Sequence, residues 1–329
     1  MRRIISLNLL ILTLFSFAGC SDDDNTTLQN DLIKKSVAPL VVGEKIQFSY
    51  AAGTTKSKLQ SFKVVASVPG AEGTNFEPYT WRTENGNDVS TVVATDCKTE
   101  GSVSSACIID SKATTLRYYY VIPEELKGRS ISFIFSSTSE DGETATFKTP
   151  TYEASSMDMR KMIELSGEEN GARYFSIEDM KAYTQEEVQT GNLSSKIDFI
   201  YAYADTKTVG ENSYAYKHAF FAPGAEAYYP DGFSLPSGLT AKETLMDKKL
   251  YVWDGQLKDD KNNNIYVDDL DLKSQTFDGS ASGILDLKAE GSIFMKSADG
   301  KHVAYIYINS LNDKTKSMVV GIKKLSNLK

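Results

Sequence analysis

One polar segment has the residue types and spacing of a cation-binding loop. From residue 260 to residue 271, side chains that carry oxygen stand at loop positions 1, 3, 5, 9 and 12, which a calcium loop uses to coordinate its ion. These side chains are Asp260, Asn262, Asn264, Asp268 and Asp271. Position 6 is Ile265, where the sharp turn of such a loop normally requires glycine. The segment is thus a candidate for a structural calcium ion or a polar, asparagine-rich turn, and we expect no other cofactor.

Patterns for catalysis are weak. The stretch 279–283, Gly-Ser-Ala-Ser-Gly, comes nearest to a nucleophile elbow, but alanine stands in the place of the nucleophile. His218 and His302 are the only histidines of the sequence, and neither has the spacing of a metal motif such as H-E-x-x-H. The 44 carboxylates offer too many pairs for a glycosidase dyad to be singled out. We therefore predict no catalytic residue and a protein that is not an enzyme, with a secreted hydrolase as a less favoured alternative.

Aromatic residues gather in one segment that is rich in proline and glycine. The members of this aromatic cluster are Phe220, Phe221, Tyr228, Tyr229 and Phe233. Turn residues at such density predict a surface segment, where exposed rings form platforms for sugars or for a protein partner. Packing of the same rings on the core is the competing interpretation. Trp81 and Trp253 cannot be assigned to either role from the sequence.

The N-terminus has the features of an exported protein. A basic start, an apolar run from residue 4 to residue 17 and small residues before a cut are the three parts of a signal peptide. The apolar run is too short to cross a hydrocarbon core of ~30 Å as a stable helix. Leu14 to Cys20, with Ala-Gly directly before the cysteine, resembles a lipobox, in which the cysteine is acylated and becomes the first residue of the mature chain. An ordinary signal peptide with a chance cysteine is the alternative.

We expect residues 1–19 to be removed and Cys20 to anchor the chain in the outer membrane through its acyl chains. The next residues, Ser21, Asp22, Asp23 and Asp24, resemble the surface-export signal of Bacteroidota lipoproteins, with a solvated linker as the alternative. Cleavage would remove two arginines and change the net charge from −8 to about −10. An acidic surface argues against nucleic acid as a partner. The expected location is the cell surface, and the expected ligand is an extracellular glycan or protein.

Two further cysteines, Cys97 and Cys107, stand ten residues apart. An exported protein folds in an oxidising compartment, where two such thiols tend to pair. We therefore predict a Cys97–Cys107 disulfide, which would add about 2–3 kcal/mol of stability in the chain-entropy model. Two separate reduced cysteines are the alternative.

The elements that must position these residues are mainly strands. Residues 20–35 are polar and without periodicity, which predicts a tether. Residues 36–150 alternate polar and apolar side chains with period two, in short runs separated by turn residues. This pattern predicts an antiparallel β-sandwich of immunoglobulin-like type, without the usual disulfide between its sheets.

Residues 156–329 predict a second, mainly-β domain with one or two short helices. The strongest strand patterns lie at 196–203, 302–308 and 317–323. Thr184 and Glu187 have the spacing of a capping box, which predicts a short helix that begins at Gln185 and stops at Gly191.

Several pieces of the chain resemble a known family. They are VGEKIQFSYAAG, VASVPGAEGTNFEP, YYYVIPEELKGRSISFIFSSTSEDGE, ARYFSIEDMKAYTQEEV and KIDFIYAY, which follow CSDDD. Together they look like a family of two-domain Bacteroidota surface lipoproteins that carry a domain of unknown function. The resemblance covers the whole mature chain and implies its fold and its location. Its motifs are strand and turn signatures, so it implies no catalytic residue.

The predicted function is the binding of an extracellular ligand by a surface-anchored lipoprotein without catalysis. A pilus-like structural or adhesion subunit is the alternative from another class. Such a subunit needs a detachable strand at one terminus, and residues 25–35 are too polar to be a convincing one.

Overall fold

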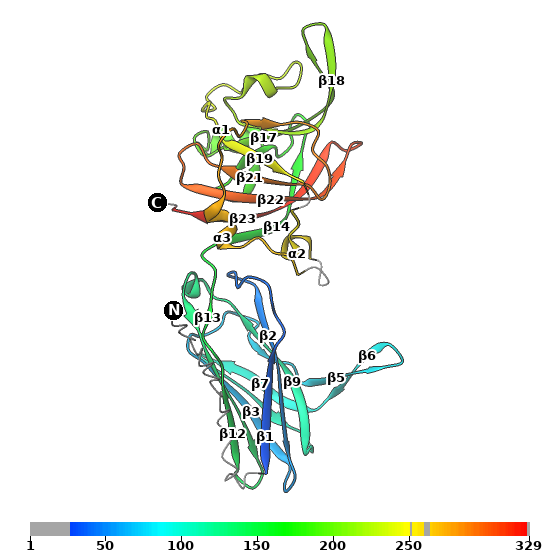
Figure 1. The fold of residues 1–329 in the computed structure, drawn as a ribbon, viewed down its shortest axis with the longest axis vertical. Helices are drawn as coiled ribbons and strands as arrows, with labels where there is room; N and C mark the ends of the chain where they lie inside the picture. Colours follow the sequence, from blue (N-terminus) through cyan, green and yellow to red (C-terminus); the bar gives the residue numbers. More distant parts are fainter. Residues whose placement is uncertain (1–26, 251, 260–263, 328–329) are drawn as a thin grey trace, which may run out of the picture.

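The computed structural model describes residues 27–250, 252–259 and 264–327. The signal peptide, Cys20 and the acidic residues 21–24 therefore lie outside the described residues. The chain forms two mainly-β domains that follow one another along the long axis of the molecule (Figure 1). This confirms the predicted fold class.

The N-terminal domain is a sandwich of two antiparallel sheets. The first sheet has the order β1 (Leu28–Lys34), β2 (Lys45–Thr54), β9 (Ala113–Val121) and β4 (Asn75–Phe76). The second has the order β12 (Thr144–Lys148), β11 (Phe133–Ser139), β3 (Leu59–Ala66), β8 (Val103–Ile108) and β7 (Ala94–Glu100). Two short ribbons complete the domain, β10 (Ser130–Ile131) with β13 (Tyr152–Glu153), and β5 (Tyr79–Glu84) with β6 (Asn87–Val92).

The strict alternation of β2 explains how the sandwich closes. Ile46, Phe48 and Tyr50 are fully buried, and the residues between them are more exposed. Successive side chains of a strand point to opposite faces, so one face of β2 enters the core. There Phe48 packs edge-on against Phe133 and Phe135 of the second sheet, with ring centroids 5.0 and 5.2 Å apart. Aromatic contacts of this kind join the two sheets.

The predicted tether is too long, because its second half is a strand. Residues 28–34 form β1, an edge strand that pairs with β2 from Leu28 opposite Thr54 to Lys34 opposite Phe48. The sequence hides this strand because the inward-facing position between Leu28 and Leu32 is Asn30, whose amide donates to the Tyr50 hydroxyl at 2.8 Å. A polar residue at a core position interrupts the alternation that marks a strand.

The C-terminal domain also packs two antiparallel sheets. The first has the order β14 (Asp158–Ser166), β23 (Ser317–Ser326), β22 (His302–Asn312), β21 (Ser292–Lys296) and β19 (Leu245–Lys249). The second has the order β16 (Lys181–Tyr183), β15 (Tyr174–Ser176), β17 (Phe199–Val209), β18 (Asn212–Phe221) and β20 (Gly283–Ile284). The patterns predicted at 302–308 and 317–323 fall within β22 and β23, and the one predicted at 196–203 overlaps β17, which begins at Phe199.

The helices are short and lie in the connections between strands. Three α-helices occur in the described part of the chain, α1 (Gln185–Thr190), α2 (Gly255–Lys258) and α3 (Asp269–Ser274), with 3-10 turns at Glu124–Leu126 and Glu226–Tyr228. The capping box of α1 is confirmed, since Thr184 Oγ1 accepts from the Glu187 amide and the Glu187 carboxylate accepts from the Thr184 amide. None of the described helices is long and apolar enough to cross a membrane.

The two domains share an apolar interface. Val41, from the loop between β1 and β2, and Met157, from the connection between the domains, are fully buried in a cluster with Leu257 and Tyr305 of the C-terminal domain. Polar contacts border this cluster, among them an ion pair at 2.9 Å between Lys161 and Glu44. The β1–β2 loop and the connection between the domains therefore both contact the C-terminal domain through buried apolar side chains.

Candidate functional site

The aromatic cluster belongs to the core, which corrects the ligand site predicted there. Phe220 and Phe221 lie at the end of β18 and are fully buried, so neither can touch a ligand. Tyr229 and Phe233 fold back over Phe221, with ring centroids 5.1 and 5.4 Å from it, and they contact each other edge-on at 4.9 Å. The cluster therefore closes one side of the C-terminal core.

Tyr228 is held in the same way. Its carbonyl oxygen accepts from the Tyr216 hydroxyl at 2.8 Å, and its ring lies over Gly283. A Cβ atom at Gly283 would come within 2.4 Å of the ring, so only glycine permits this contact. The prolines and glycines of the segment shape the chain so that its rings turn inward.

The calcium loop is not assembled as predicted. Asp260 and Asn262 lie outside the described residues, and Asn264 is exposed. Asp268 is the N-cap of α3, where its carboxylate accepts from the backbone amides of Leu270 and Asp271. The backbone amide of Asp268 in turn donates to the Asp271 carboxylate. Both carboxylates thus cap a helix. The described residues contain no group of three or more His, Cys, Asp or Glu side chains that could hold a metal ion.

A buried lysine forms an ion pair with Asp254, the residue that precedes α2. Lys323 Nζ donates to Asp254 Oδ2 at 2.6 Å and to the Val267 carbonyl oxygen at 2.8 Å, and both charged side chains are fully buried. Burial lowers the pKa of Lys323, and the carboxylate of Asp254 opposes that shift. Asp254 also accepts from the amide of Val267, which fastens the two ends of the 254–267 segment together. The buried ion pair and the bond to the Val267 carbonyl anchor both ends of this segment to β23.

The two cysteines lie on one hairpin as free thiols, so the predicted disulfide is not formed in this structure. Cys107 of β8 stands opposite Thr95 of β7, and the register shifts between Thr95 and Lys98, where Cys97 lies. Burial raises the pKa of the Cys97 thiol, and the neighbouring Cys107 adds to the effect. The pairing stays a prediction for thiols that the fold brings close together.

Both histidines have structural partners. His218 of β18 is buried, with Nδ1 2.7 Å from the Tyr201 hydroxyl and Nε2 3.0 Å from Asp313 Oδ1. His302 of β22 has its Nδ1 3.0 Å from Ser326 Oγ. His218 therefore links the Tyr201 hydroxyl to the Asp313 carboxylate, and the Tyr201 side chain is itself fully buried.

The outer face of the first sheet carries a groove that the sequence did not indicate. Along the middle strand β2 the outward-facing residues are small or polar: Gln47, Ser49, Ala51 and Gly53. The register places Ile33 of β1 and Arg117 of β9 on either side of Ser49. The longer side chains of the two neighbouring strands therefore flank the short side chains of β2. This outer groove runs along β2 between β1 and β9.

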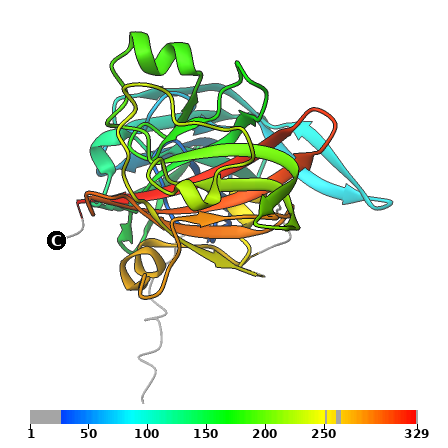
Figure 2. The same cartoon turned by 90° about the horizontal axis from the view of Figure 1, so that it is seen from above.

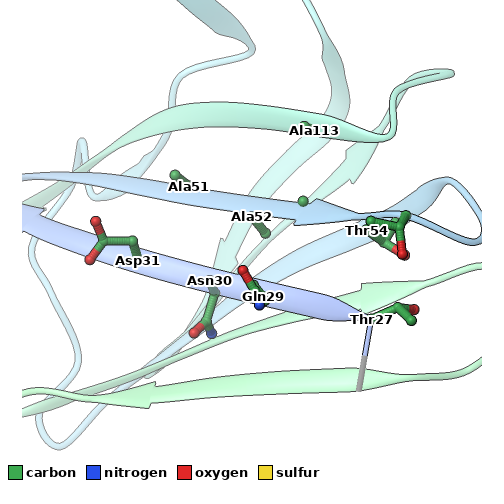
Figure 3. A pocket seen from close by; sticks show the side chains of 10 residues that line it. Thr27, Gln29, Asn30, Asp31, Ala51, Ala52, Thr54 and Ala113 are labelled. Carbon is green, nitrogen blue, oxygen red and sulfur yellow. The ribbon is translucent and has the colours of Figure 1, made fainter. Parts of the chain in front are cut away.

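Two hollows lie along the outer groove. One of about 650 Å³ lies where β2 ends, and Figure 3 shows Gln29 and Asp31 on β1, Ala51 on β2 and Ala113 on β9 around it. The other, of about 360 Å³, lies nearer the C-terminal domain. It is lined by Lys35, Gln47, Ser49, Thr80, Trp81, Thr115 and Arg117. The second hollow combines hydroxyl groups, an amide, two cations and an indole.

The β5–β6 ribbon projects from the body of the domain and forms an arm beside the outer groove (Figure 1). Its turn is Asn85-Gly86, both at positive φ as a two-residue hairpin turn requires. Trp81 stands on this arm with 38% of its surface exposed. The Arg117 guanidinium lies over the indole at 4.6 Å from the ring centre, and the indole Nε1 donates to Glu77 Oε2 at 2.9 Å. Two contacts therefore fix the orientation of an exposed ring.

The cations of the second hollow are not neutralised by ion pairs. No ion pair within the described ranges involves Lys35 or Arg117, although the whole chain is acidic. The Glu77 carboxylate is the nearest opposite charge that the contacts show, and it accepts from Trp81 and from the Tyr119 hydroxyl. The hollow thus offers hydrogen-bond donors next to an aromatic face.

The comparisons assign the chain to a family. The family described as "Domain of unknown function (DUF4466)" matches residues 25–154, and "Domain of unknown function (DUF8576)" matches residues 155–327. A crystal structure of a DUF4466 family protein from Parabacteroides merdae is 34% identical, with a TM-score of 0.82, and covers 92% of this chain and 99% of its own. The chain belongs to the DUF4466 family. Its two matched domains meet at the boundary that the structure shows, with β1 inside the first.

Other solved structures share little with the chain. A family 123 glycoside hydrolase from Clostridium perfringens is 14% identical, with a TM-score of 0.26 over 39% of this chain and 27% of its own. The BcpA major pilin subunit of Bacillus cereus is 10% identical, with a TM-score of 0.29 over 65% of each chain. Likenesses of this size carry no argument about function. A search of the curated proteins finds no significant match.

Proposed function

We propose that this DUF4466 protein is a surface-anchored lipoprotein that binds an extracellular glycan without catalysis, and that the outer groove beside Trp81 is its binding site. One observation supports this above the others: the partly exposed Trp81 ring, held in place by Arg117, stands beside a hollow lined by hydroxyl, amide and cationic groups. An aromatic face with adjacent hydrogen-bond donors suits a sugar ring, which has an apolar face and a polar edge.

The position at which β1 begins is compatible with a lipid anchor at Cys20. Leu28 pairs with Thr54, at the end of β2 away from Val41 and the domain interface. An anchored Cys20 would therefore hold the N-terminal domain near the membrane, because the eight residue-to-residue steps from Cys20 to Leu28 span at most about 28 Å. The C-terminal domain would extend outward. The outer groove would then run along the side of the molecule, where a surface polymer can reach it.

The anchor is tested by membrane fractionation and by protease treatment of intact cells. Cys20→Ala should release the protein from the membrane fraction, since the acyl chains provide the attachment. Replacement of Asp22, Asp23 and Asp24 by alanine should keep it membrane-bound but protect it from added protease. A Cys20→Ala variant that stays fully membrane-bound would refute the anchor.

Glycan binding is tested on an array of neutral and acidic polysaccharides with the soluble Cys20→Ala mature chain. Trp81→Ala should reduce binding at least tenfold, because stacking residues dominate such sites. Trp253→Ala is a matched control, since that tryptophan is also 38% exposed but lies in the other domain. Equal loss in both variants, or capture of a protein partner with no glycan bound, would count against the proposal.

A further inference from the structure

The C-terminal domain contains a separate pocket beside α1. It has a volume of about 200 Å³ and is bounded by Tyr174 of β15, by one side of α1, by the loop that follows α1 and by the turn at residues 236–239. This volume is below that of pockets for drug-sized ligands, which range from about 300 to 1,000 Å³. The pocket therefore suits one small ring.

The lining of this pocket is polar but uncharged. Its polar side chains are Tyr174, Gln185, Gln189, Asn192, Ser194 and Ser237. No lysine, arginine, aspartate or glutamate lines it, although these residues make up 24% of the chain. Val188 and Leu239 contribute apolar surface. We call this site the amide pocket.

The amide groups of the pocket are available to a ligand. Gln185 Oε1 accepts from the Tyr174 hydroxyl at 3.4 Å, which is a long contact. The side chains of Gln189 and Asn192 form no hydrogen bond with any other residue that the structure describes. Each amide carries both donor and acceptor groups, which matches the hydroxyl groups of a sugar, since these also donate and accept.

The walls of the amide pocket are held in place without a ligand. The turn at its rim is closed by a hydrogen bond from the Leu239 amide to the Pro236 carbonyl at 3.1 Å. Behind it, Lys242 Nζ donates to the Ser195 carbonyl at 2.7 Å and to the buried Asp198 carboxylate at 3.2 Å. Lys242 thus ties the turn to the loop that follows α1. A pocket whose walls are fixed in advance loses little entropy when it binds.

We propose that the amide pocket binds one neutral monosaccharide unit, as the end or a branch of a glycan. We infer a neutral sugar because no charged side chain among the described residues lines the pocket. A carboxylate or phosphate bound there would lose its water without gaining a cationic partner. The pocket is in the other domain from the outer groove, so this inference does not rest on the glycan site proposed there. In Figure 2, which views the molecule from the C-terminal-domain end, α1 lies at the edge of the fold.

The experiment is an NMR titration of the soluble Cys20→Ala mature chain. It measures the chemical shifts of the backbone amides of residues 185–194 as sugar is added. The probes are methyl glucoside, methyl galactoside, methyl mannoside and N-acetylglucosamine, with glucuronic and galacturonic acid as charged counterparts. At least one neutral sugar should bind with a dissociation constant on the order of millimolar, which is usual for a ligand of this size. The uronic acids should bind at least tenfold more weakly.

Three variants locate the site. Gln189→Ala should weaken binding about tenfold, and Ser237→Trp should abolish it by filling the mouth of the pocket. Glu186→Ala is the matched control, because this exposed residue is on the same helix but does not line the pocket. The proposal is overturned if no neutral sugar shifts these amides, if the uronic acids bind equally well, or if Glu186→Ala weakens binding as much as Gln189→Ala. Trp81→Ala should leave this titration unchanged, which separates the amide pocket from the outer groove.

Discussion

The aromatic cluster of the C-terminal domain and the arm of the N-terminal domain hold the same kind of side chain in opposite surroundings. Phe221, Tyr229 and Phe233 lie in a turn-rich segment and pack on one another over the core. Trp81 and Tyr79 lie on a regular strand, yet both are 38% exposed. Turn residues therefore predict the path of the chain and not the direction of its side chains.

The cause is the presence or absence of a covering layer. The segment that follows β18 crosses back over a sheet, so its rings meet other apolar groups. The arm is a two-stranded ribbon whose side chains are mostly exposed, and it meets the body of the domain where β5 contacts β9. A ribbon of this kind is only marginally stable by itself and needs contacts with its neighbours, such as that between Trp81 and Arg117.

The largest effect is expected from Phe221→Ala. This ring is fully buried among the aromatic contacts of the cluster, so its loss should lower the free energy of unfolding by ~3–5 kcal/mol. Chemical denaturation of the wild-type and variant proteins measures the difference. A loss below about 1 kcal/mol would show that the cluster does not close the core.

A disulfide at the base of the arm comes next. Strand β7 follows the arm directly and carries Cys97. If Cys97 and Cys107 pair on export, reduction should lower stability by about 2–3 kcal/mol in the chain-entropy model. Mass spectrometry of a non-reduced digest decides whether the bond exists. Two alkylated thiols in freshly isolated protein would contradict it.

Tyr229→Ala should have a smaller effect, of about 2 kcal/mol, because its ring is only half-buried. Tyr229→Phe keeps the ring and removes only the hydrogen bond to the Pro223 carbonyl, so it should cost about 1 kcal/mol. Comparison of the two denaturation midpoints separates packing from hydrogen bonding. Unchanged stability in both, together with loss of a ligand, would restore the cluster as a binding surface.

The smallest effect is expected from Trp81→Ala, which should change stability by less than about 1 kcal/mol. Its ring is partly exposed, and its contacts are one cation–π contact with Arg117 and one hydrogen bond to Glu77, each of which contributes little to folding. The same variant should lose glycan binding. A destabilisation comparable with that of Phe221→Ala would place Trp81 among the structural residues.

Much of the fold follows from the sequence, and little of the candidate site does. Period-two patterns located the main strands, and Thr184 with Glu187 located α1, because these signals depend on residues close together in the chain. β1 was missed because Asn30 faces inward and bonds to Tyr50, a partner twenty residues away. Asp254 and Lys323 were missed for the same reason, since 69 residues separate them.

The sequence by itself determined the mainly-β class, the two-domain order and the local caps and turns, because each depends on periodicity or on neighbouring residues. Only the tertiary structure decided which aromatic rings are covered, which carboxylates cap helices and where the outer groove and the amide pocket lie. These properties depend on which distant strand or loop lies opposite a side chain. Burial and charge pairing are set by such long-range contacts, and they decide whether a ring, a carboxylate or an amide stabilises the fold or is available to a ligand.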